Sequence, residues 1–298
     1  LLVCGRLILA ASGGAASGIG HGRLRPDVLI GGGIVVVYLF CALAPGLVAP
    51  HDPLASLPDG LTATGTPHVP GEGGFLLGTD LLGRDLLSRV VHGARVAVMI
   101  AIVPNLIALA LATVVALTAG YGRGLAETIL MRMTESFLVL PVFLIAMAVI
   151  ATFGSSTLTI ILTLAFVSWA YPARVLHGEV RRLANAPHVE AARSLGAGVF
   201  RITLRHILPH LTPILVVYFT MNAAYMVMLE AGLAFLGFGV QPPTPSWGLM
   251  LADARDQFFR PWLIIVPGTS LALLCIGLSL IGNAAEKESP FRARRVLL

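Results

Sequence analysis

Six stretches of this 298-residue chain are apolar along nearly their whole length and long enough to cross a lipid bilayer. About 20 apolar residues span the hydrocarbon core as a helix. A spanning segment must satisfy its backbone hydrogen bonds within itself, so each stretch is predicted to be a helix rather than a buried strand. The spans are about residues 28–49, 96–120, 136–153, 157–176, 211–235 and 262–282. The sequence therefore predicts an all-α integral membrane protein.

Composition excludes the main alternatives to a membrane protein. Charged residues make up 12% of the chain and hydrophobic residues 56%, whereas soluble domains are about 25% charged. This balance argues against a soluble enzyme and against a disordered chain. The cysteines Cys4, Cys41 and Cys275 lie far apart, so neither a disulfide framework nor a Cys-x-x-Cys metal pair can be built from them.

Arginine and lysine set the expected orientation of the helices. Basic residues are retained on the cytoplasmic side of a membrane, and with the N-terminus inside, 15 of the 20 Lys and Arg residues fall on cytoplasmic segments. Both termini are therefore expected in the cytoplasm. Since topology accounts for the net charge of +5, nucleic acid is not expected as a partner.

This topology divides the chain into consecutive parts. Residues 1–27 are expected to be a cytoplasmic tail, 28–49 the first transmembrane helix, 50–95 an extracytoplasmic loop, 96–283 a core of five helices, and 284–298 a second cytoplasmic tail. Within the core, residues 177–210 form a long cytoplasmic loop and residues 236–261 an external loop. A cleaved secretory signal is the alternative for the first tail, but Gly and Ser interrupt its apolar stretch.

The extracytoplasmic loop ends in a segment with the pattern of an amphipathic helix. Between Asp80 and Val91, three apolar pairs alternate with charged residues. This spacing is typical of a helix lying in the membrane interface, and we expect such an external amphipathic segment before the second transmembrane helix. A solvated lead-in to that helix is the alternative.

The most informative residues lie in the long cytoplasmic loop between the fourth and fifth spans. Residues 190–209 read EAARSLGAGVFRITLRHILP. We interpret them as a short helix, a turn permitted by Gly196, a second short helix, and Pro209 at the start of the fifth span, where proline loses no hydrogen bond. Such a helix can present a surface to a cytoplasmic partner and move two spans together. A solvated amphipathic loop is the alternative.

This stretch resembles the EAA loop of ABC importer permeases, whose pattern is Glu-Ala-Ala, three residues, Gly, nine residues, Ile, one residue and Leu-Pro. Six positions match in register, namely Glu190, Ala191, Ala192, Gly196, Leu208 and Pro209. His206 occupies the isoleucine position, and Ile207 follows it. Residues 77–89 and 235–253 are similar to further signatures of the dipeptide, oligopeptide and nickel subfamily. The resemblance covers about residues 28–285.

The resemblance implies a permease subunit of an ATP-driven importer in a bacterial inner membrane. A second homologous permease subunit, two ATPase subunits, an extracytoplasmic substrate-binding protein and membrane lipid are the implied partners. Residues 190–196 would form a coupling helix on an ATPase subunit, and the ATPase subunits would bind ATP and Mg²⁺. Short peptides are the expected solute, with nickel, haem or glutathione as alternatives.

The chain itself is not expected to be an enzyme or to bind a cofactor. Its single lysine, Lys287, is not part of a Gly-Lys-Ser/Thr motif, so it cannot form a Walker A loop for ATP. A membrane-embedded enzyme would show convergent polar residues at matching depths in several spans, and an ion-driven carrier would show acids near the midplane. The spans are nearly bare of ionisable residues.

A few polar residues remain as candidates for the solute pathway or for docking. Glu230, an acid well within an apolar run, and Asn105, beside Pro104, are candidates for the pathway or its outer gate. The alternatives are that Glu230 holds the outer loop in place and that Pro104 simply kinks its helix. The candidates for docking the binding protein are Asp80, Arg84, Asp85, Arg89 and Trp247, with a solvated helix face as the alternative.

Overall fold

The computed structural model describes residues 26–288, and within that range it contains helices and two isolated β-bridges but no strand. In chain order the helices are α2 (Pro26–Leu43), the 3-10 helix η1 (Pro45–Leu47), α3 (Leu86–Gly122), α4 (Gly124–Val139), α5 (Val142–Phe153), α6 (Thr157–Ser168), α7 (Ala170–Ala184), α8 (Pro187–Ser194), α9 (Val199–Ile202), the π-helix η2 (Thr203–Ile207), α10 (Leu208–Phe235), α11 (Trp247–Ala254) and α12 (Trp262–Glu288). Nearly all of the predicted N-terminal tail and most of the C-terminal tail lie outside the described residues.

Four helical stretches are each long and apolar enough to cross a membrane. They are α2, α3, α12 and the continuous run Val199–Phe235, which comprises α9, η2 and α10. Two further candidates are bent pairs, α4 with α5 at 89° and α6 with α7 at 42°. The described part of the chain is therefore an all-helical membrane protein with four spanning helices, or up to six if each bent pair is one span.

Both bends interrupt segments that the sequence predicts as single straight spans. Pro141 is the N-cap of α5, in an extended conformation, and Pro172 is the third residue of α7. Proline has no amide hydrogen to donate and its ring clashes with the carbonyl four residues earlier, so a helix breaks or bends there. The third predicted span also begins earlier than residue 136, because α4 starts at Gly124 after a turn in which Arg123 and Gly124 both have positive φ.

The prediction of a separate amphipathic helix before the second span is wrong. Residues 80–85 form a turn, and α3 begins at Leu86 because the Asp85 carboxylate accepts a hydrogen bond of 3.1 Å from the Ser88 amide. The apolar residues Leu86, Val90 and Val91 are buried rather than turned toward lipid. The segment is thus the outer end of α3 itself.

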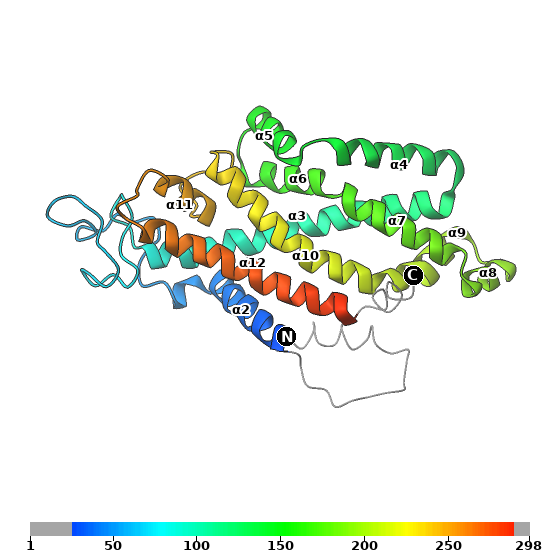
Figure 1. Ribbon diagram of the computed structural model, residues 1–298, viewed down its shortest axis with the longest axis horizontal. Helices are drawn as coiled ribbons and strands as arrows, with labels where there is room; N and C mark the ends of the chain where they lie inside the picture. The colour runs from blue at the N-terminus through cyan, green and yellow to red at the C-terminus, as the bar shows by residue number, and fades with distance from the viewer. Residues whose placement is uncertain (1–25, 289–298) are drawn as a thin grey trace.

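Helix α3 lies at the centre of the molecule and packs against α2, α7 and α10 (Figure 1). One hydrophobic cluster joins α3 to α6, α7, α8 and α10, and a second joins its outer end to α2, α11 and α12. The long loop between η1 and α3 and the α8–α9 segment lie at opposite ends of the molecule (Figure 1). The core therefore connects both ends through α3.

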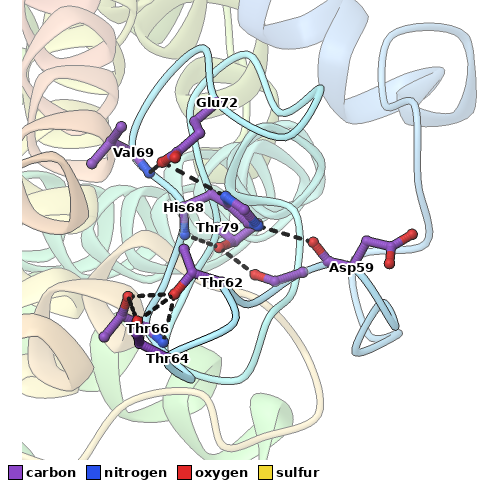
Figure 2. Close-up of polar contacts among 9 residues, drawn as sticks. Asp59, Thr62, Thr64, Thr66, His68, Val69, Glu72 and Thr79 are labelled. Atoms are coloured by element: carbon purple, nitrogen blue, oxygen red, sulfur yellow. Dashed lines mark hydrogen bonds and ion pairs between the residues drawn. The ribbon is translucent and has the colours of Figure 1, made fainter.

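The loop between η1 and α3 is held by hydrogen bonds among its own residues, as Figure 2 shows. The Thr62 and Thr66 hydroxyls lie 2.7 Å apart, and the His68 amide donates to the Thr79 hydroxyl at 2.8 Å. The His68 ring Nε2 lies 3.1 Å from the Asp59 carbonyl oxygen. This loop is an ordered structure on the end of the helix bundle rather than a plain connection.

Glycine allows α2 to approach α12 closely. A Cβ on Gly31 would lie 2.8 Å from the carbonyl oxygen of Gly277, and a Cβ on Gly277 would lie 2.9 Å from Ile34. Small residues permit such backbone contact between helices in a membrane. Gly33, two residues along α2, has no atom within 4 Å of the corresponding position.

We expect Gly31→Leu to destabilise the protein by about 1–3 kcal/mol because the larger side chain must separate α2 from α12. Gly33→Leu, the matched control, should change stability by no more than about 0.5 kcal/mol. Thermal unfolding of both variants in the same detergent measures the difference. Equal midpoints for the two variants would contradict the packing of α2 on α12.

Candidate functional site

The α8–α9 segment projects from the end of the molecule opposite the long loop between η1 and α3, which is called the outer loop below (Figure 1). Helix α8 starts with Pro187 at its first position and ends at Ser194. Gly196 has a φ of +81°, a conformation that favours glycine, and the Ala197 amide donates to the Ala192 carbonyl at 3.0 Å. The helix, the glycine turn and the second helix lie where the sequence predicts them.

One face of α8 is fixed to the core and the other is free. Val189 and Ala192 are buried in the same hydrophobic cluster as Leu183 of α7 and Ile202 of α9. The His188 ring stacks on the His210 ring, at the start of α10, with centroids 5.0 Å apart. Helix α8 is therefore in contact with α7, α9 and the start of α10.

The free face of this segment combines polar and apolar residues. Glu190 and Ala191 are exposed. Leu195 is 88% exposed and Phe200 77% exposed, and Val199 is also exposed. Leu208 is half-buried and Pro209 exposed, both at the start of α10. The sequence analysis did not single out Leu195 and Phe200, although apolar residues on both sides of a glycine turn in a basic loop were a signal for them.

Asn105 joins two helices inside the bundle. It is fully buried, its Nδ2 donates to the Phe219 carbonyl at 2.7 Å, and its Oδ1 accepts from Asn222 Nδ2 at 2.9 Å. A side chain that lines a solute pathway must be reachable by solute. The structure instead gives Asn105 the role of tying α3 to α10.

Glu230 lies beneath the connection between α10 and α11. Its side chain is buried, and its carboxylate accepts a hydrogen bond from the backbone of Val240 in that connection. Its Oε1 has no hydrogen-bond partner among the described residues. This placement corresponds to the alternative in which Glu230 holds the external connection between α10 and α11 in position.

The charged residues at the outer end form an internal network. Arg84 Nε donates to Asp80 Oδ2 at 2.6 Å, and Arg89 Nη1 lies 3.1 Å from the same oxygen. Asp80 Oδ1 also accepts from the amides of Leu82 and Arg84, each at 2.9 Å. Asp80 therefore pairs with two arginines and closes the turn that leads into α3.

This network and Trp247 are not accessible enough to dock another protein. Arg89 is only 3% exposed and Asp85 is only 1% exposed. The Trp247 indole is buried, donates to the Val90 carbonyl at 2.9 Å and packs over Gly93. The expectation of a docking patch at these residues is thus corrected, because they bury their charges and rings inside the outer end of the bundle.

The arrangement has the architecture of a transporter's membrane subunit. The solved MetNI methionine ABC transporter, in inward-facing conformations, contains a chain of the same fold, with a TM-score of 0.54 at 20% identity over 67% of this chain and 94% of that chain. The family model described as "Binding-protein-dependent transport system inner membrane component" matches residues 108–288. The chain belongs to this family of importer permeases.

Relatives within this family carry the names of peptide transporters. The Di/tripeptide transport system permease protein DppC of Pseudomonas aeruginosa is 37% identical over 85% of this chain and 84% of its own length. The Dipeptide transport system permease protein DppC of Haemophilus influenzae is 32% identical over 84% of this chain and 85% of its own length. The Glutathione transport system permease protein GsiD of Pectobacterium atrosepticum is 36% identical over 70% of this chain and 69% of its own length.

The charge network generates a prediction about the outer end. Asp80→Asn should destabilise the protein by about 3 kcal/mol, because it leaves Arg84 and Arg89 buried without a counter-ion. Glu72→Gln is the control, since Glu72 is exposed, lies 3.7 Å from the His68 ring and accepts a 3.4 Å hydrogen bond from the Val69 amide, which glutamine can also accept. Limited proteolysis of residues 50–85 should be faster in Asp80→Asn than in the control. Equal cleavage rates would contradict the structural role of Asp80.

Proposed function

We propose that this permease imports short peptides and that α8 couples their passage to ATP hydrolysis in separate ATPase subunits. The solute is inferred from the relatives named for di- and tripeptides and for glutathione, itself a tripeptide. Their common chemistry is a short peptide with free termini. Nickel and haem, the other solutes that the sequence resemblance leaves open, have no counterpart among these relatives.

The observation that carries the coupling role is the exposed face of α8 and α9. Leu195 and Phe200 place large apolar surface in solvent beside the charged Glu190. Exposed apolar residues rimmed by polar ones favour an interface with another protein. An ATPase subunit in the cytoplasm would cover them, with Ala191 allowing close approach and Gly196 forming the turn.

The mechanism follows from the way α8 is anchored. Binding of ATP and Mg²⁺ by two partner ATPase subunits would draw these subunits together and displace α8. Because Val189 and Ala192 are packed into the core, α7 and α10 would move with it. The outer halves of the spans would then separate to accept solute from an extracytoplasmic binding protein. The two states need only differ in how the partner holds α8.

A second homologous permease would complete the pathway. The α4–α5 pair leaves Val139, Leu144 and Phe153 largely exposed. Lipid and a partner permease are the two environments in which such apolar surface is stable. The proposal assigns the pathway to the contact between the two permeases.

The proposed topology places α8 and both termini in the cytoplasm of a bacterial cell, with the chain in the inner membrane. Lys287 Nζ lies 3.1 Å from Asp27 Oδ2, so the start of α2 and the end of α12 are on one side. That side is the α8 end of the molecule, away from the outer loop (Figure 1). Six crossings, with each bent pair counted as one, agree with this arrangement.

We expect Glu190→Lys to reduce solute-stimulated ATP hydrolysis by the assembled complex at least about tenfold, because reversing a charge within an interface costs several kcal/mol. Glu286→Lys makes the same change on an exposed residue near the end of α12 and should leave hydrolysis unchanged. Both variants should insert and assemble. Normal stimulation in Glu190→Lys would contradict the coupling role of α8.

Cysteine labelling tests the orientation. In a variant without Cys4, Cys41 and Cys275, a membrane-impermeant maleimide applied to spheroplasts should label Ala63→Cys in the outer loop. It should label Leu195→Cys only after the membrane is broken. Both positions are exposed in this chain, and the permease is expressed without ATPase subunits, so the membrane is the only barrier to labelling. Labelling of Leu195→Cys in intact spheroplasts would reverse the proposed topology.

A further inference from the structure

A cavity of about 230 Å³ lies at the outer end of the molecule, next to the charge network. Its lining brings together the turn before α3, the first turn of α3, α11 and the start of α12. The polar side chains in its wall are Asp80, Arg84, Arg89 and Asp253, and Leu82, Met250 and Leu263 are among the apolar ones.

Two arginines and two aspartates stand in this wall, and they are not all paired with one another. Asp80 is the one carboxylate within ion-pair distance of Arg84 and Arg89 in the described part of the chain, and it serves both. The Arg89 side chain is 97% buried; its Nη1 pairs with Asp80, whereas its Nε has no hydrogen-bond acceptor among the described residues. A buried cation without a full partner is costly. The inner wall of the cavity therefore favours an anion.

Asp253 is the second carboxylate in the wall of the cavity. It is exposed, and no hydrogen bond or ion pair engages its carboxylate among residues 26–288. Partial burial raises the pKa of this carboxyl, and the charges of Arg89 and Arg84 oppose the rise. A ligand that fits both ends carries an anionic group for the arginines and a cationic group for Asp253.

The depth of the cavity in the membrane identifies the source of such a ligand. Helix α12 has 27 residues and is about 40 Å long, which matches a bilayer including its headgroups. Leu263, the second residue of α12, lines the cavity. Helix α11 and the start of α12, which line the cavity, lie at the end of the molecule opposite α8 (Figure 1). The cavity is therefore at the level of the lipid headgroups.

We propose that this cavity binds a phospholipid whose headgroup carries both a phosphate and an ammonium group. The phosphate faces Arg84 and Arg89, the ammonium faces Asp253, and Leu82, Met250 and Leu263 contact the apolar part of the lipid. The lipid fixes α11 and the outer loop to the ends of α3 and α12. The assignment to the outer leaflet rests on the proposed function, whereas the recognition of the headgroup does not.

Native mass spectrometry of the purified full-length chain, taken from bilayers with equal amounts of phosphatidylethanolamine and phosphatidylglycerol, tests this site. The wild type should retain phosphatidylethanolamine preferentially. Asp253→Asn should lower that preference about two- to fivefold, because a partly exposed ion pair contributes less than about 1 kcal/mol. Arg89→Gln should lower retention of both lipids, with thermal unfolding checking its fold.

Asp256→Asn is the matched control, since Asp256 is exposed and pairs with Arg255 at 3.4 Å. It should retain the wild-type preference. An unchanged preference in Asp253→Asn would overturn the proposal. So would displacement of the lipid by a dipeptide or by soluble phosphoethanolamine at equal concentration. Because the measurement needs no ATPase and no transport, its failure is separate from failure of the proposed function.

Discussion

The bilayer offers no hydrogen-bond partner to an exposed backbone, and this constraint governs the structure. The described spanning segments are therefore helices. Two of them bend next to Pro141 and Pro172, whereas α3, α10 and α12 each continue through an internal proline. Buried polar side chains are subject to the same constraint. Asn105 of α3, for example, forms hydrogen bonds with two residues of α10. The approach of α2 to α12 relies on glycine. A bundle built in this way moves as packed helices and not as loose segments.

The α8–α9 segment is joined to this bundle by side-chain packing. Only eight residues form α8, yet its buried side chains share a hydrophobic cluster with α3, α7 and α10. The exposed Leu195 and Phe200 lie on the opposite side of the same short segment. In the proposed function, a force applied to the exposed residues would reach the bundle through this packed core.

Sequence patterns predicted the apolar spans, the Gly196 turn and the short helix before it, because hydropathy and backbone conformation are local properties. They did not predict the bends at Pro141 and Pro172, since a hydropathy profile does not register a missing amide. They also misplaced the charges around Asp80. A pattern of alternating charged and apolar residues is the same whether the charges face solvent or one another. The sequence also did not predict the cavity, because its lining combines Asp80, Arg84 and Arg89 with Asp253, which is distant from them in the chain.

The claim that matters most is that this chain provides the passage while a partner provides the energy. Uptake of a labelled dipeptide into proteoliposomes tests it directly, with the permease pair reconstituted alone or together with the ATPase subunits, binding protein and ATP. We expect uptake only in the complete assembly and no nucleotide hydrolysis by the permeases alone. Uptake or hydrolysis by this chain without the ATPase subunits would contradict the account.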